Sequence, residues 1–121
     1  MTKTVLIVED NDLNLKLFED VLAAEGYSIL SATDGVSVAA IARERHPDLI
    51  LMDIQLPELS GLDATRQIKR DEGIADIPVI AITAHALPGD EQRIRAGGCA
   101  DYVAKPVMIV DLVSTVKRHL N

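Results

Sequence analysis

Residues 49–53 read Leu-Ile-Leu-Met-Asp, a run of four apolar side chains that ends in an acid. Three other short apolar runs are each followed directly by a reactive side chain. They cover residues 5–8, 79–82 and 102–104. Such runs are typical of strands buried on both faces of a parallel sheet. Because the binding crevice of an open parallel sheet lies beyond the carboxyl ends of its strands, the groups after the runs should converge. These groups are Glu9, Asp10, Asp53, Thr83 and Lys105.

Helical patterns separate the strands. We expect a further strand over residues 28–32, with Asp34 as the candidate cap of the helix that follows it. Five strands alternating with five helices predict a doubly wound α/β fold, a three-layer sandwich whose parallel sheet has the order 2-1-3-4-5. We expect one domain over residues 1–121, without an output domain. The predicted helices cover residues 11–24, 34–45, 60–70, 90–96 and 108–120.

The composition narrows the classes of function. A formal net charge of −7 over 121 residues argues against binding nucleic acid or an anionic membrane. The single cysteine, Cys99, cannot form an intramolecular disulfide and is expected to be a small buried apolar residue. No apolar stretch approaches the roughly 20 residues that span a bilayer, and no signal peptide is expected. The sequence therefore predicts a cytoplasmic protein, recruited to a membrane or cell pole only through a partner.

The residue types after the strands favour phosphoryl chemistry. Three carboxylates in one crevice repel each other unless a cation or a proton joins them, and hard oxygen ligands suit Mg²⁺. Lys105 is a point charge that can bind a phosphate oxygen, and the Thr83 hydroxyl can donate to a second one. Asp53 can then act as a nucleophile, which predicts an aspartyl phosphate. Alternatively, an acid that follows a strand can be only a helix cap or a solvated loop residue.

Over residues 3–120 the chain resembles the receiver domains of response regulators, the family of CheY-like proteins. Each motif is weak alone, but their order and spacing together are highly specific. The motifs are Val8-Glu9-Asp10-Asn11, residues 51–57, Gly61, Thr83-Ala84 and Lys105-Pro106. The resemblance implies that a histidine kinase or a histidine phosphotransfer protein donates a phosphoryl group to Asp53. It also implies a phosphoacceptor that assists its own phosphotransfer and slow dephosphorylation, and not an ordinary enzyme.

The resemblance also assigns roles around Asp53. Mg²⁺, with Mn²⁺ as a substitute, would be bound by Asp10, Asp53 and the backbone carbonyl of Gln55. Glu9 replaces an aspartate found in many receivers, and its longer arm would reach a metal-bound water. Lys105 and Thr83 would contact the phosphoryl oxygens, and the Lys105–Pro106 peptide would be cis. As Thr83 closes on the phosphate, Tyr102 would move inward and act with it as the switch.

A domain without an output domain must signal by phosphorylation-dependent protein binding. Within the family, residues 10–14 and 53–57 are most similar to stand-alone regulators of the alphaproteobacterial cell cycle. The first helix should bury a stripe from Asn14 to Leu22 that includes Leu17, and the last helix a set that begins with Ile109. An apolar rim beside the site would dock a kinase helix pair, although isolated surface aliphatics are also ordinary. The rim residues are Leu13, Leu15, Val107 and Met108.

Three alternatives remain open. A chemotaxis-type receiver would use the same site. A phosphatase that forms an aspartyl phosphate usually carries a second acid two residues after its nucleophile, where this chain has Gln55. A flavodoxin-like nucleotide carrier would need a Ser/Thr/Gly-rich phosphate loop after the first strand, where residues 9–12 are mostly acidic. His85, two residues after Thr83, could tune the access of water to the phosphate or could simply be solvated.

Overall fold

The computed structural model describes residues 2–84 and 89–120, so His85 lies outside the described residues. Strands and helices alternate along the chain, as the sequence predicts. Among the described helices, none has the length and apolar character needed to span a bilayer. The elements are β1 (Thr4–Val8), α1 (Asp12–Ala24), β2 (Ser28–Ala32), α2 (Val38–Arg45), β3 (Leu49–Asp53), α3 (Gly61–Arg70), β4 (Val79–Thr83), α4 (Asp90–Ala96), β5 (Asp101–Ala104) and α5 (Ile109–Leu120).

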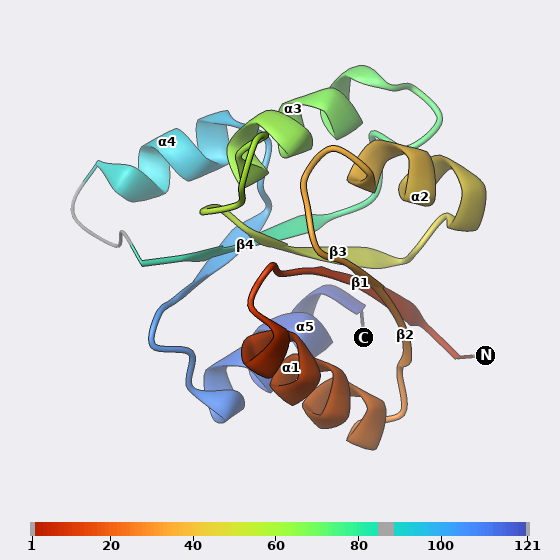
Figure 1. Cartoon of the computed structure of the whole chain (residues 1–121), viewed down its shortest axis with the longest axis vertical. Coiled ribbons are helices and arrows are strands. Elements are labelled where there is room, and N and C mark those ends of the chain that lie inside the picture. The colour runs from red at the N-terminus through yellow and green to blue at the C-terminus, as the bar shows by residue number, and fades with distance from the viewer. Residues whose placement is uncertain (1, 85–88, 121) are drawn as a thin grey trace.

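The five strands form one parallel sheet in the order β2-β1-β3-β4-β5, which confirms the predicted topology. Helices α1 and α5 cover one face of the sheet, and α2, α3 and α4 cover the other (Figure 1). The register aligns the strand ends: Val8 pairs with Met52, Asp53 with Ile82, and Thr83 with Ala104. The loops after β1, β3, β4 and β5 therefore leave the sheet along one edge.

Aliphatic side chains fill both spaces between the sheet and its helices. Every residue of β3 and β4 is buried, as expected for strands covered on both faces. Phe18 and Leu22 of α1 pack with Leu112 and Val116 of α5 against one face. Cys99 is buried on the other face, beside Thr65, which confirms its predicted apolar role. The two cores fix the strands, and through them the positions of the groups at the strand ends.

The predicted start of the second helix is wrong. The helix begins at Val38, with Ser37 at the cap position, and Asp34 lies four residues earlier. The Asp34 carboxylate accepts hydrogen bonds from the Ser37 backbone N–H at 2.9 Å and from the Ser37 hydroxyl at 2.8 Å. Aspartate often stabilises a local turn in this way, which competes with helix formation. Asp34 thus closes the loop before α2 instead of capping the helix.

Two residues predicted to face the core are exposed. Leu17 of α1 is 43% exposed, because α1 packs on the sheet along the line of Phe18 and Leu22. Ile109 of α5 is 48% exposed and lies in a surface groove with Val110, so the buried face of the helix begins only at Leu112. An apolar side chain is therefore exposed near the middle of α1 and another at the N-terminal end of α5.

In the loop between β3 and α3, Glu58 has a left-handed backbone conformation that is unfavourable for any residue except glycine. Glu58 has φ 64°, and Leu59 N–H donates to Pro57 C=O at 2.8 Å across it. A left-handed conformation costs a non-glycine residue about 1–2 kcal/mol, and glycine adopts it freely. Glu58→Gly should therefore stabilise the protein by on the order of 0.5–1 kcal/mol, after the entropy of the unfolded chain is counted.

Urea denaturation of both proteins measures the difference in unfolding free energy. The matched control is Glu72→Gly, because Glu72 is also an exposed loop glutamate and has no positive φ. The control should be neutral or slightly destabilising. Equal destabilisation by both substitutions would mean that the Glu58 backbone is not strained.

Candidate functional site

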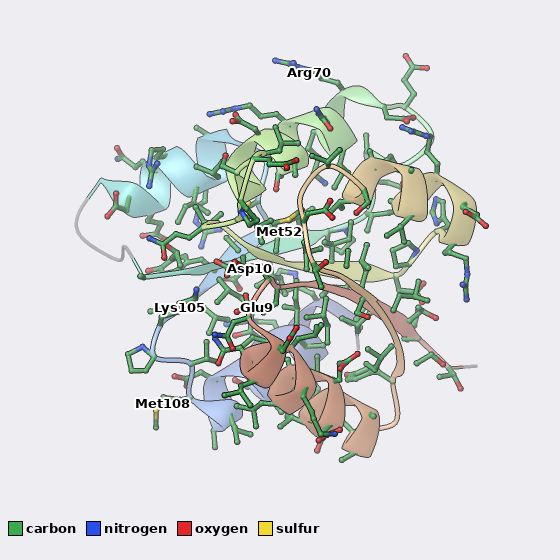
Figure 2. All side chains as sticks on the ribbon, in the orientation of Figure 1. Glu9, Asp10, Met52, Arg70, Lys105 and Met108 are labelled. Carbon is green, nitrogen blue, oxygen red and sulfur yellow. The ribbon has the colours of Figure 1, made fainter. Side chains whose placement is uncertain are left out.

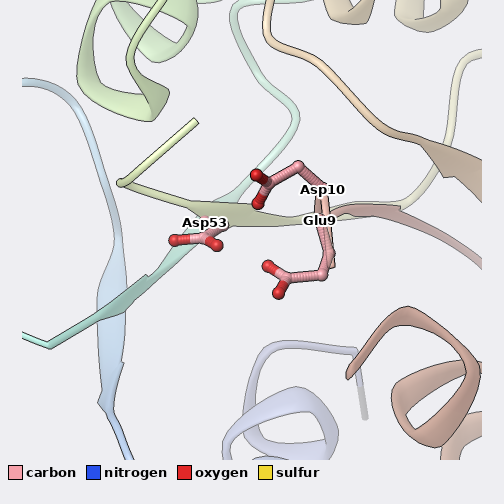
Figure 3. A group of neighbouring side chains, drawn as sticks. All are labelled: Glu9, Asp10 and Asp53. Atoms are coloured by element: carbon pink, nitrogen blue, oxygen red, sulfur yellow. The ribbon is translucent and has the colours of Figure 1, made fainter. Parts of the chain in front are cut away.

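Three acids from two adjacent strands meet at the carboxyl edge of the sheet. Glu9 and Asp10 follow β1, and Asp53 is the last residue of β3. One carboxylate oxygen from each residue lies within 4.8 Å of the other two, and Figure 3 shows the three groups facing a shared space. Glu9 and Asp53 are buried, whereas Asp10 is exposed. The acid cluster is therefore open to solvent on the Asp10 side. The predicted convergence of the ends of β1 and β3 is confirmed.

Lys105 brings a positive charge to this cluster from the end of β5. Its Nζ lies 3.2 Å from Oδ1 and 3.1 Å from Oδ2 of Asp53, whose side chain is only 2% exposed. The Gln55 backbone N–H also donates to Oδ1 of Asp53, at 3.0 Å. The Lys105–Pro106 peptide bond is cis, as the resemblance implies. These contacts fix the Asp53 carboxylate with one face toward Lys105.

Glu9 is held on one oxygen only. The Asn14 side-chain amide donates to Oε1 of Glu9 at 3.1 Å, whereas Oε2 is buried and has no hydrogen-bond partner among the described residues. Burial and the neighbouring Asp53 carboxylate raise the pKa of Glu9 to about 7. The cluster thus carries more negative charge than its surroundings stabilise. An orphaned carboxylate oxygen and three hard oxygen donors fit a divalent cation such as Mg²⁺.

Thr83 and Tyr102 belong to β4 and β5, the two strands that follow β3 in the sheet. Thr83 ends β4 and is fully buried. It follows Ile82, which pairs with Asp53, so Thr83 lies one residue beyond the level of Asp53 on the neighbouring strand. Tyr102 is half-buried and packs against the core on the α2–α4 face. The structure thus places Thr83 at the same edge of the sheet as Asp53 and Tyr102 two residues before the end of β5, and their roles in switching remain predictions.

The predicted apolar rim divides into two kinds of residue. Leu13 is 82% exposed and Met108 is 63% exposed, and Figure 2 shows Met108 pointing away from the fold. Leu15 and Val107 are half-buried and pack against the α1–α5 core. A surface groove adjoins Val107. The sequence does not predict this groove, because its shape depends on how α1 packs against the loop between β5 and α5. The groove is lined by Asn14, Leu17, Phe18, Lys105, Pro106 and Val107.

Gly61 has a structural role that its motif alone does not explain. A Cβ atom at this position would collide with the backbone oxygen of Asp53. The Gly61 N–H also donates to the Ile54 carbonyl at 3.0 Å. Only glycine therefore lets the start of α3 pass this close to the end of β3, which holds the loop after Asp53 beside the site.

Comparison with known proteins agrees with this geometry. The family model of the response regulator receiver domain matches residues 5–117. The polar-differentiation response regulator DivK of Brucella abortus is 54% identical over 120 residues, which cover 99% of this chain and 98% of the relative. DivK of Brucella anthropi is 52% identical over the same length.

Solved structures support the same assignment. The receiver domain of the sensor histidine kinase PA1611 from Pseudomonas aeruginosa is 37% identical, with a TM-score of 0.88 over 98% of this chain and 97% of that one. That structure has a magnesium ion coordinated in its active-site cleft. The chemotaxis regulator CheY4 of Vibrio cholerae, at 24% identity, 98% and 99% coverage and a TM-score of 0.93, supports the fold alone. From its fold, its acid cluster and these relatives, this chain belongs to the response regulator receiver domain family.

Proposed function

We propose that this chain is a stand-alone response regulator whose Asp53 accepts a phosphoryl group from a histidine kinase or a histidine phosphotransfer protein. The observation that carries the proposal is the environment of Asp53. Its carboxylate is buried, faces two other acids and contacts Lys105 Nζ at 3.1 Å. A phosphoryl acceptor needs a positioned oxygen nucleophile and nearby charges that neutralise the phosphoryl oxygens, and both are present.

In the proposed transfer, an Asp53 carboxylate oxygen attacks the phosphorus of a phosphohistidine. The new O–P bond forms as the N–P bond breaks, and the histidine nitrogen keeps the electron pair of that bond. Lys105 then exchanges its contact with the free carboxylate for one with a phosphoryl oxygen, and the Thr83 hydroxyl donates to another. Water later hydrolyses the acyl phosphate slowly, so the protein is a phosphoacceptor and not a conventional enzyme.

The proposed cation is Mg²⁺, with Mn²⁺ as a substitute. Asp10, Asp53 and the backbone carbonyl of Gln55 would hold it, and Glu9 would act through a bound water. The cation would neutralise charge on the acids and on the incoming phosphoryl group. The orphaned Oε2 of Glu9 and the magnesium in the related Pseudomonas aeruginosa receiver domain support this assignment.

Mg²⁺ should stabilise the protein, because it binds the folded acid cluster and not the unfolded chain. At a Mg²⁺ concentration ten times the dissociation constant, the unfolding free energy rises by about 1.4 kcal/mol. This gain corresponds to a rise in melting temperature on the order of 5 °C. Asp10→Asn removes one ligand and one repulsive charge, so it should melt above the wild type without Mg²⁺ and respond little to added Mg²⁺. Thermal unfolding of both proteins, without Mg²⁺ and at millimolar Mg²⁺, measures both effects.

The control for this experiment is Asp12→Asn, because Asp12 is an exposed acid two residues from Asp10 and outside the acid cluster. It should keep the full response to Mg²⁺. A wild-type melting temperature that does not change with millimolar Mg²⁺ would remove the metal site from the proposal.

We place the signalling role in polar differentiation and cell-cycle control. The 54% identity to DivK, a polar-differentiation regulator, supports this role over a chemotaxis role. The exposed Leu13 and Met108, with the half-buried Leu15 and Val107, provide an apolar surface beside the site that suits a kinase helix pair. The phosphorylated state would bind its target through the surface formed by α4, β5 and α5, which Tyr102 adjoins.

Incubation with acetyl phosphate and Mg²⁺, followed by intact-mass measurement, separates the candidate functions. A single phosphoryl adduct that persists for minutes supports the response regulator. Rapid consumption of acetyl phosphate without an adduct supports the phosphatase, and neither adduct nor consumption supports the nucleotide carrier. Co-purification from the native host with wild type and Asp53→Asn then identifies partners that depend on phosphorylation.

A further inference from the structure

Asn14 is fixed in place by the first turn of α1. The Asn11 side chain at the cap position accepts a hydrogen bond from the Asn14 backbone N–H at 3.0 Å. This contact sets the start of the helix directly after the two acids that follow β1. The Asn14 side chain then points back toward β1, and its amide donates to Oε1 of Glu9 at 3.1 Å. Sequence and helix cap together place this amide beside the acid cluster.

Glu9 needs such a contact more than an aspartate would. A glutamate has one more rotatable bond than an aspartate, so its carboxylate explores more positions before it is ordered. In this structure only Oε1 has a hydrogen-bond donor among the described residues, and that donor is Asn14. The other oxygen, Oε2, is buried and without a described partner, on a carboxylate that faces Asp10 and Asp53 (Figure 3).

We propose that Asn14 is a positioning residue, which holds Oε1 of Glu9 so that Oε2 remains directed at the cation site. This inference rests on the proposed magnesium site. Hydrogen-bond partners that orient the groups around a bound metal commonly raise its affinity by about 10–100-fold. Because Glu9 acts through a water, Asn14 should contribute at the lower end of that range.

The test is the Mg²⁺ dissociation constant of the unphosphorylated protein, measured by isothermal titration calorimetry. Asn14→Leu keeps the approximate shape of the side chain and removes the amide, so it should weaken Mg²⁺ binding about 10-fold. Asn14→Ala should weaken Mg²⁺ binding by the same factor, and it replaces Asn14→Leu in the test if that variant folds poorly. Leu17→Ala is the matched control, because Leu17 lines the same groove on α1 and its apolar side chain cannot donate to Glu9. This control should bind Mg²⁺ like the wild type.

A double-mutant cycle separates positioning from a general structural effect. If Asn14 acts through Glu9, then Asn14→Leu should cause no further loss of Mg²⁺ affinity in a Glu9→Gln background. An equal loss of about 10-fold in that background, or unchanged affinity of Asn14→Leu in the wild-type background, would overturn the inference while leaving the proposed function intact. A wild-type protein that binds no Mg²⁺ would overturn both.

Discussion

Asp53→Asn is expected to reduce phosphoryl incorporation from acetyl phosphate to background while the protein remains folded. An amide is a poor nucleophile toward phosphorus, and within the described part of the chain Asp53 is the acid that pairs with Lys105 Nζ. The fold should persist, because the substitution removes a negative charge from a cluster that carries three acids. Phosphate labelling with intact-mass detection measures incorporation, and circular dichroism measures folding.

The control for this loss is Asp63→Asn, since Asp63 is exposed on α3 and pairs with Arg66, three residues along the helix. Such exposed pairs contribute about 0–1 kcal/mol, so the control should label and melt like the wild type. Full labelling of folded Asp53→Asn would mean that another residue accepts the phosphoryl group.

Thr83→Ala should accept the phosphoryl group but fail to transmit the signal. Thr83 is fully buried at the end of β4. We expect its hydroxyl to reach a phosphoryl oxygen through an inward shift of the end of the strand. That shift would vacate space for Tyr102 and change the surface of α4, β5 and α5. One phosphate can reverse the populations of two conformations that differ in free energy by a few kcal/mol. The contact of the Thr83 hydroxyl with the phosphate would provide part of that free energy.

The measurement is the affinity of phosphorylated wild type and phosphorylated Thr83→Ala for a target recovered by co-purification. A loss of about 10-fold, or 1.4 kcal/mol, is expected. Thr33→Ala is the matched control, because Thr33 is exposed just after the edge strand β2. Equal affinities of phosphorylated wild type and Thr83→Ala would show that this threonine carries no signal.

Much of the fold could be predicted from the sequence because the buried strands carry a strong pattern. Residues 49–53 and 79–83 are buried throughout, and continuous apolar runs of this length are typical of strands covered on both faces. Helix boundaries are harder to predict, because they depend on local hydrogen bonds that compete with the helix. Asp34 forms a hydrogen bond with Ser37, and α2 begins after this turn. Leu17 and Ile109 fit the periodicity of a buried helix face, yet both are exposed because the sheet does not cover them.

The composition of the site could also be predicted, because parallel strands deliver their carboxyl ends to one edge. The choice of Glu9 as the acceptor of the Asn14 amide depends on the rotamers of both side chains and on the exact start of α1. The close backbone approach that Gly61 permits likewise depends on how α3 meets β3. Details of this kind come from packing between elements and have no local signature.

The most direct test of the central claim locates the phosphoryl group. Protein labelled with acetyl phosphate and Mg²⁺ is reduced with borohydride, which converts an aspartyl phosphate to homoserine, and its peptides are sequenced by mass spectrometry. We predict homoserine at position 53 and at no other acid, with none formed when Mg²⁺ is chelated. Homoserine at Asp10 or at an acid outside the cluster, with Asp53 unmodified, would contradict the account.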